Sequence, residues 1–257
     1  MGNYYFLAPS LPPLLLRDKP DITFEELKVR LAVNLDKSDL LLARTLMRFT
    51  DICNIRNLFM EEPIDSRGTM SEKELDEALL VRAGLPDYVF EFLDEFEKTQ
   101  DRIRQFSALM ARFFQEEIPK LKGFLKKYFT FEREWRLVLV GIRAKQLGRD
   151  LARELQFEDF ADPFVAQILA QKDADRYEPP MEYSELSELI VATYPDAWEQ
   201  HKAFAEYRFK KVEEMAEDSL FSIDVILAYM ARLMIIEQYN ELDEEKGQMI
   251  LETFVHK

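Results

Sequence analysis

The sequence contains very little cysteine and glycine. Cys53 is the only cysteine, so no disulfide forms within the chain and a reducing compartment is expected. Seven glycines are too few for the tight turns and phosphate loops of β-sandwiches, barrels and open α/β sheets. No glycine precedes a lysine and no Gly-x-Gly occurs, so both common phosphate-binding fingerprints are absent. The composition therefore favours an all-α protein.

Histidine, a frequent catalytic and metal-binding residue, is equally scarce. His201 and His256 are the only histidines, and neither belongs to a His-Glu-x-x-His or Glu-x-x-His motif. Cys53 follows Leu46 and Phe49 at helical spacing, which is typical of a core thiol rather than a nucleophile served by His201. We therefore expect no catalytic residues, no cofactor and no metal site, although an enzyme with an unrecognised site is an open alternative.

The charge is strongly negative overall but uneven. A net charge of −15 and a pI of about 4.8 argue against nucleic-acid binding, which usually requires a basic surface. Between residues 120 and 150, however, basic residues outnumber acidic ones. This stretch predicts either a docking face for an acidic partner or a solvated helix face balanced by acidic neighbours. The candidate docking residues are Lys122, Lys126, Lys127, Arg133 and Arg136.

No segment has the length and apolarity of a transmembrane helix. The most apolar candidate, residues 219–236, carries Asp224 and Arg232. The uncharged opening MGNYYFLAPSLPPLLL lacks a basic region and is interrupted by prolines, so we expect no signal peptide. The sequence predicts a cytoplasmic protein.

Helical periodicity dominates the chain, and no segment shows convincing period-2 alternation. Capping-box patterns at Thr23–Glu26 and Ser71–Glu74 predict two helix starts, and Ser38 or Asp39 is expected to cap another. The expected helices cover residues 24–35, 39–60, 72–80, 89–118, 120–129, 133–155, 163–171, 182–193, 196–216, 223–240 and 243–255.

We expect one all-helical domain over residues 1–257, made of consecutive segments. An N-terminal unit (1–85) precedes a central antiparallel helical hairpin (86–172), whose turn is expected at residues 128–132. A linker (172–182) then leads to a C-terminal unit (182–257). The predicted architecture is an elongated multi-helix array.

Two apolar helices carry the same polar couple. Asp51 precedes Asn54 by three residues in DICNIRNLF, and Glu237 precedes Asn240 in EQYNEL, 186 residues later. Buried carboxylates and amides require partners, because an unmet buried polar group costs about 1–3 kcal/mol. Together with Arg56, these residues are therefore expected to be structural polar pairs within two similar helical units, with a third unit left open.

The residues around these couples resemble a known family. The long helix ending in acid-x-x-Asn, with Ile55, Arg56 and Leu58, then a break and SEKELDEAL, is similar to the repeated helical unit of the central-stalk C/d subunit of V/A-type rotary ATPases. The matching residues are Asp51, Asn54, Ile55, Arg56, Leu58, Gly68, Glu72 and Leu75, and, in the second copy, Ile226, Leu227, Ala228, Tyr229, Glu237 and Asn240. The opening NYYFLAPSLPPL also resembles a small bacterial family of unknown function associated with ATPase subunits.

The resemblance implies a mechanical function. It implies a funnel- or socket-like, non-catalytic protein that couples the membrane rotor ring to the central axle in ATP-linked ion transport. Its implied partners are the rotor-ring and axle subunits, and its implied location is cytoplasmic and peripheral to the inner membrane through the complex. A free cytosolic helical adaptor or assembly factor is the alternative.

Overall fold

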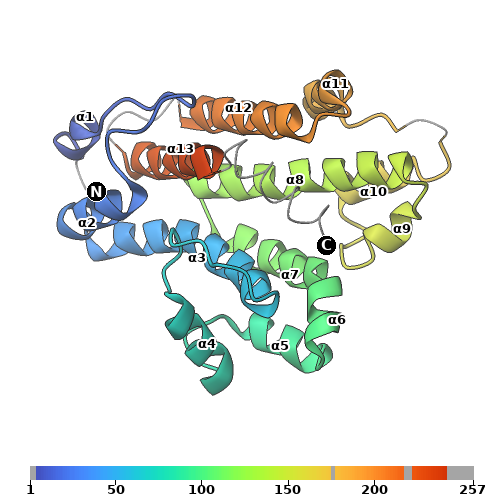
Figure 1. Cartoon of the computed structure of the whole chain (residues 1–257), viewed down its shortest axis with the longest axis horizontal. Coiled ribbons are helices and arrows are strands. Elements are labelled where there is room, and N and C mark those ends of the chain that lie inside the picture. The colour runs from blue at the N-terminus through green and yellow to red at the C-terminus, as the bar shows by residue number, and fades with distance from the viewer. Residues whose placement is uncertain (1–3, 175–176, 217–221, 242–257) are drawn as a thin grey trace, which may run out of the picture. The chain divides into compact units, whose positions relative to one another are not determined.

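The computed structural model describes residues 4–174, 177–216 and 222–241 (Figure 1). Helices make up the regular structure of these residues, which contain no strand, so the all-α prediction is confirmed for them. The helices are α1 (Leu7–Ser10), α2 (Phe24–Asn34), α3 (Lys37–Phe59), α4 (Glu72–Val81), α5 (Asp87–Glu95), α6 (Thr99–Arg104), α7 (Phe106–Glu117), α8 (Gly123–Gln146), α9 (Leu151–Glu154), α10 (Pro163–Leu169), α11 (Ser184–Thr193), α12 (Ala197–Ala216) and α13 (Ile223–Glu241), with 3-10 turns η1 (Ile118–Lys120) and η2 (Met181–Tyr183).

The chain divides into two compact units, while the single domain with consecutive sub-units that the sequence suggests stays a prediction. Unit 1 combines Met1–Leu41 with Glu185–Lys257, and unit 2 is the continuous segment Leu42–Ser184. Helices α1 and α2 thus share one unit with α12 and α13. The expected funnel or socket shape stays a prediction.

In unit 1, the apolar helix α13 is the central element. It packs along α12 and against α2, and its residues between Ile226 and Ile236 are nearly all buried. The predicted capping box at the start of α2 is confirmed, because Thr23 and Glu26 each accept a hydrogen bond from the other's backbone N–H. The predicted shorter helix at residues 243–255 lies outside the described residues.

In unit 2, a cluster of aromatic rings joins three helices. Phe49 of α3 lies 5.1 Å from Phe113 and 5.7 Å from Phe114 of α7, measured between ring centroids. Phe129 of α8 completes the cluster, 5.7 Å from Phe49 and 5.3 Å from Phe113. Burial of four large rings at such spacings is a major source of stability for this unit.

The predicted central hairpin is wrong at its turn. Residues 128–132 lie within α8, where Tyr128, Phe129 and Glu132 are buried. The break comes earlier, where Pro119 lies in the 3-10 turn η1 and Gly123 adopts a φ of 56° at the start of α8. Proline and a left-handed glycine end helices for backbone reasons, and both residues were visible in the sequence.

The long helix expected over residues 89–118 is also divided, into α5, α6 and α7. Arg102 stabilises the first break. Its Nε donates to the carbonyl of Phe96 at 2.6 Å and its Nη2 donates to the carbonyl of Leu93 at 3.2 Å. These bonds satisfy carbonyl groups that a helix end would otherwise leave unpaired.

The C-terminal part of unit 2 packs on α8. The predicted start of α10 is confirmed, because Asp162 accepts from the N–H groups of Phe164 and Val165. The described part of the predicted linker lies close to α8, since the Lys145 ammonium donates to the carbonyl of Ala174 at 2.7 Å and Tyr177 contacts Gly141.

Candidate functional site

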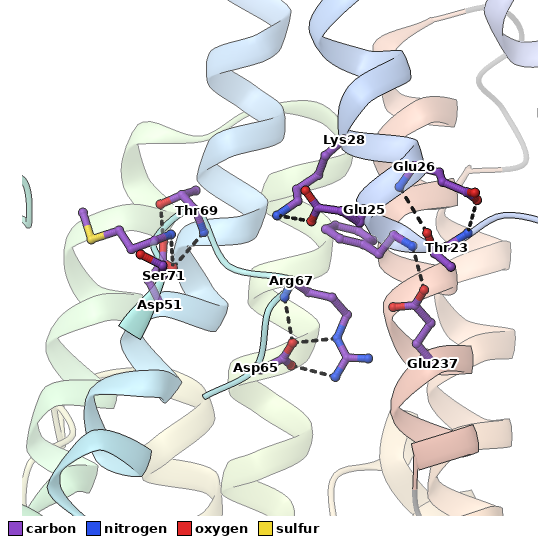
Figure 2. A network of polar contacts seen from close by, with 12 residues as sticks. Thr23, Glu25, Glu26, Lys28, Asp51, Asp65, Arg67, Thr69, Ser71 and Glu237 are labelled. Carbon is purple, nitrogen blue, oxygen red and sulfur yellow. Dashed lines mark hydrogen bonds and ion pairs between the residues drawn. The ribbon is translucent and has the colours of Figure 1, made fainter. Parts of the chain in front are cut away.

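The first polar couple begins with Asp51, a carboxylate that is 1% exposed within α3. Its Oδ1 accepts hydrogen bonds from the N–H of Thr69 at 2.8 Å and of Met70 at 3.2 Å, and its Oδ2 accepts from the Thr69 hydroxyl at 2.5 Å. Figure 2 shows these contacts converging on the carboxylate. Asp51 therefore fixes the chain just before α4.

Asn54 performs a similar function one turn later. Its side chain is fully buried, donates from Nδ2 to the carbonyl of Asp65 at 2.8 Å and accepts from the N–H of Asp65 at 2.8 Å. Asp65 in turn binds the guanidinium of Arg67 through both carboxylate oxygens, at 2.7 and 2.9 Å (Figure 2). Residues 60–71, which we name the α3–α4 loop, are thus fastened to α3 at two successive turns.

Gly68 makes this fastening possible. A Cβ at this position would lie 2.2 Å from Oδ1 of Asp51, which is well inside van der Waals contact. The loop backbone can approach the carboxylate only because residue 68 has no side chain. Gly68 is one of the residues that carry the family resemblance, and its place beside Asp51 gives that pattern a physical reason.

The Asp51 carboxylate is held at an electrostatic cost. Burial raises the pKa of Asp51 above its usual range, while the hydrogen bonds from Thr69 and Met70 and the charge of Arg48 act in the opposite direction. The three hydrogen bonds that it accepts all come from the α3–α4 loop. This arrangement orders the backbone of the loop.

Glu237 in unit 1 also binds backbone, but of a different segment. Its Oε1 accepts from the N–H of Phe24 at 2.6 Å, at the first turn of α2 (Figure 2). A carboxylate at this end is favoured because it meets an unpaired N–H and the positive end of the helix dipole. Glu237 therefore joins α13 to α2.

The other members of the expected polar pairs differ from the first couple. Asn240 is exposed in the last turn of α13, beyond the apolar run that ends at Ile236, and Arg56 is exposed on α3. Arg56 points away from the buried face because Asp51, Asn54 and Ile55 occupy that face. Among contacts between described residues, the acidic member of the second couple has the structural contact that the sequence suggested.

The structure separates the candidate docking residues into two groups. Lys122, Lys126 and Lys127 are exposed at the N-terminal end of α8 and form no ion pair within the described ranges. Arg133 instead pairs with Glu158 at 2.8 Å and with Asp162 at 3.1 Å, and its side chain is 13% exposed. The basic surface is therefore the lysine group.

Arg136 is likewise occupied internally. It pairs with Glu132 at 3.2 Å, and its guanidinium lies 4.8 Å from the centroid of the Phe49 ring. Glu132 is fully buried and also accepts from the Trp135 indole N–H at 3.2 Å. Such a buried acid needs a charged partner, and the i, i+4 spacing to Arg136 was the sequence signal that could have revealed it.

A polar cavity of about 650 Å³ in unit 2 was not foreseen. Its lining includes the nearly buried Glu117, whose Oε1 lies 3.8 Å from Arg48 and accepts from the Tyr88 hydroxyl at 3.4 Å. Burial, followed by the charge of Glu117, raises the pKa of Tyr88 well above its usual range. These groups come from three helices, so no local motif could have linked them.

Metal-ligating side chains do not cluster in the part of the chain that the structure describes. No group of three or more His, Cys, Asp or Glu side chains within these ranges is arranged to hold a metal ion. No helix among the described residues combines the length and hydropathy needed to cross a bilayer.

Sequence comparison finds relatives that match nearly the whole chain. An uncharacterized protein of Chlamydia pneumoniae is 33% identical over 257 residues, covering 98% of this chain and 97% of that protein. Uncharacterized proteins of Chlamydia muridarum (strain MoPn / Nigg) and Chlamydia trachomatis serovar D are each 29% identical over 259 residues, with the same coverage. No solved structure matches. The family described as "Protein of unknown function (DUF2764)" matches residues 1–257, and the chain belongs to this family.

Proposed function

We propose that this protein is a non-catalytic, central-stalk component of a V/A-type rotary ATPase, similar to the C/d subunit of those enzymes. In this function it couples the membrane rotor ring to the central axle during ATP-linked ion transport. It resides in the cytoplasm and meets the membrane through the complex.

One observation carries the proposal. Asp51 and Asn54, which carry the resemblance to the central-stalk family, use their side chains to bind the backbone of the α3–α4 loop. A motif whose polar atoms fasten a helix to its following loop serves architecture, as a torque-transmitting part requires. The packed rings around Phe49 add stiffness, because close-packed interiors resist deformation.

The exposed lysine group on α8 supplies a docking surface for this function. Lys122, Lys126 and Lys127 present three positive charges on a protein whose net charge is −15. A local patch of opposite sign orients the approach of an acidic partner. We assign this surface to a contact with an acidic region of the axle or rotor-ring subunits.

The test is recovery of ATPase subunits with the tagged protein from its native host. Wild type should recover rotor-ring and axle subunits, and a variant with Lys122→Glu, Lys126→Glu and Lys127→Glu should recover neither. Arg133 is left unchanged because its reversal would disrupt an internal ion pair. The matched control reverses three exposed lysines elsewhere, namely Lys19, Lys73 and Lys172.

Each outcome has a distinct meaning. If wild type recovers no ATPase subunit under gentle extraction, the proposed function is wrong. If the α8 variant still recovers them, the docking surface is wrong while the function stands. A protein that is present during assembly but missing from the purified, active complex would be an assembly factor, which is the alternative function.

A further inference from the structure

A second surface in unit 2 is a groove between the end of α3 and helices α4, α5 and α6, with a volume of about 900 Å³. Leu80 of α4 is the most exposed apolar side chain in it, at 80%, and the adjoining Val81 is 59% exposed. Further apolar groups line the groove: Leu58, Phe59, Leu79 and Leu93. Exposed leucines that adjoin a hollow of this kind mark an interaction surface more often than isolated exposed apolar residues do.

The charges of the groove are acidic once internal pairs are counted. Arg82 is paired with Asp94, at 2.8 and 2.7 Å, whereas Arg102 keeps its positive charge because it donates to a backbone carbonyl. The exposed carboxylates of Glu61, Asp76 and Glu97 form no ion pair within the described part of the chain. The groove therefore combines apolar side chains with a lining of net charge −2, because four carboxylates (Glu61, Asp76, Asp94 and Glu97) meet two guanidinium groups (Arg82 and Arg102).

We propose that this groove is a docking site for a basic amphipathic helix of a partner protein. Apolar side chains on one face of such a helix would cover Leu80 and its neighbours, and flanking Lys or Arg would meet Glu61, Asp76 and Glu97. α4 has ten residues and is about 15 Å long, which matches about three turns of a partner helix. An acidic helix or an anionic lipid surface would be repelled by the carboxylates of the groove.

This proposal goes beyond the ATPase assignment and does not rest on it. It concerns a different surface from the lysine group of α8, and it can be tested on the purified full-length protein. Failure of subunit recovery would refute the ATPase function only, and failure of helix binding would refute the groove proposal only.

The probe is a fluorescent 15-residue peptide with Leu on one helical face and Lys at the remaining positions. Fluorescence anisotropy gives its affinity at about 50 and about 200 mM salt. A peptide with Glu in place of every Lys and a Leu/Lys peptide of scrambled order serve as ligand controls. Hydrogen exchange of the complex locates the bound segment.

The first variant is Leu80→Ser, which removes an exposed apolar side chain that the peptide would cover. We expect it to weaken peptide binding about tenfold. Its matched control is Leu147→Ser, which alters a leucine that is 62% exposed elsewhere in unit 2. A second variant neutralises carboxylates of the groove with Glu61→Gln, Asp76→Asn and Glu97→Gln and should reduce the salt dependence. Its control neutralises three other exposed acids: Asp173, Glu182 and Glu188.

Support requires protection from exchange within residues 58–104, loss of affinity in both groove variants and near-wild-type affinity in both controls. The proposal is overturned if wild type does not bind the Leu/Lys peptide. It is also overturned if the Glu peptide or the scrambled peptide binds as tightly as the Leu/Lys peptide. It is overturned equally if each control variant loses as much affinity as its groove variant, or if the protected amides lie outside residues 58–104.

Discussion

Replacing Asp51 by alanine should release the α3–α4 loop and destabilise unit 2. The change removes the acceptor of three hydrogen bonds, two from backbone N–H groups and one from the Thr69 hydroxyl. Each unmet buried donor costs about 1–3 kcal/mol. Thr69 is exposed and Met70 is half-buried, so water can compensate part of the loss. We expect a total loss of about 2–4 kcal/mol, a large part of the stability of an ordinary domain.

The Asp51→Asn variant separates hydrogen bonding from charge. Its Oδ1 can accept from the same two N–H groups, and its amide can donate to the Thr69 hydroxyl. We expect its free energy of unfolding at neutral pH to lie within about 1 kcal/mol of wild type. Because burial disfavours the Asp51 anion, this variant can even exceed wild type.

The pH dependence of this difference follows from the raised pKa of Asp51. The folded state binds the proton more tightly than the unfolded state, where an aspartate has a pKa of about 3.9. The resulting stabilisation of wild type is complete below that pH and is lost as the pH rises through the folded pKa. Relative to wild type, Asp51→Asn should therefore gain stability between acidic and neutral pH.

Urea denaturation followed by circular dichroism gives the global free energies, and limited proteolysis reports the loop directly. Asp51→Ala should speed cleavage within residues 60–71, while Asp76→Ala, which alters an exposed acid of α4, should not. The reasoning fails if the free energy of unfolding of Asp51→Ala lies within about 0.5 kcal/mol of the wild-type value, which is the effect of a neutral surface substitution. It fails equally if Asp51→Asn is as unstable as Asp51→Ala.

Three further substitutions test other contacts. Gly141→Ala would place a Cβ 2.6 Å from Cζ of Tyr177 and should reduce the free energy of unfolding by about 1–3 kcal/mol. The melting temperature should fall, and adding Tyr177→Leu should restore part of it. An unchanged melting temperature would show that the linker moves aside without cost. Glu237→Ala should lower the free energy of unfolding, measured by urea denaturation, by about 1 kcal/mol, because the N–H of Phe24 loses its acceptor. Glu237→Gln keeps an acceptor oxygen and should lose less stability. Equal losses in the two variants would contradict a hydrogen-bond explanation. Arg133→Met should lower the free energy of unfolding by about 2 kcal/mol, because Glu158 and Asp162 then repel each other without a cation between them. In thermal melts, added salt should recover part of this loss by screening the repulsion. An unchanged melting temperature would refute the prediction.

Local signals in the sequence were sufficient for many elements of the fold. The capping boxes of Thr23 and Ser71 were predictable because their partners lie three residues away. The start of α3 shows the limit of such rules, since Asp36 accepts from the N–H groups of Ser38 and Asp39 at 2.9 Å, although Ser38 or Asp39 was expected to cap the helix. Neighbouring cap residues compete, and the sequence alone does not rank them.

The site was predictable in kind but not in its partners. Burial of Asp51 and Asn54 followed from their positions in an apolar helix, whereas the N–H groups of Thr69 and Met70 became partners only through the return of the loop. Glu237 and its partner Phe24 are separated by 213 residues. Partners at such distances depend on tertiary packing, which periodicity does not encode.

The division of the chain has a consequence for its biogenesis. Residues 42–184 form a continuous unit, so every contact internal to it can form while translation of the remainder is still under way. The first 41 residues must instead wait for α12 and α13, which are synthesised after unit 2. Until then Phe24, Leu27 and Leu31 lack the cover that leaves them almost fully buried in the finished protein. These three apolar side chains are therefore expected to stay exposed until α13 has been synthesised.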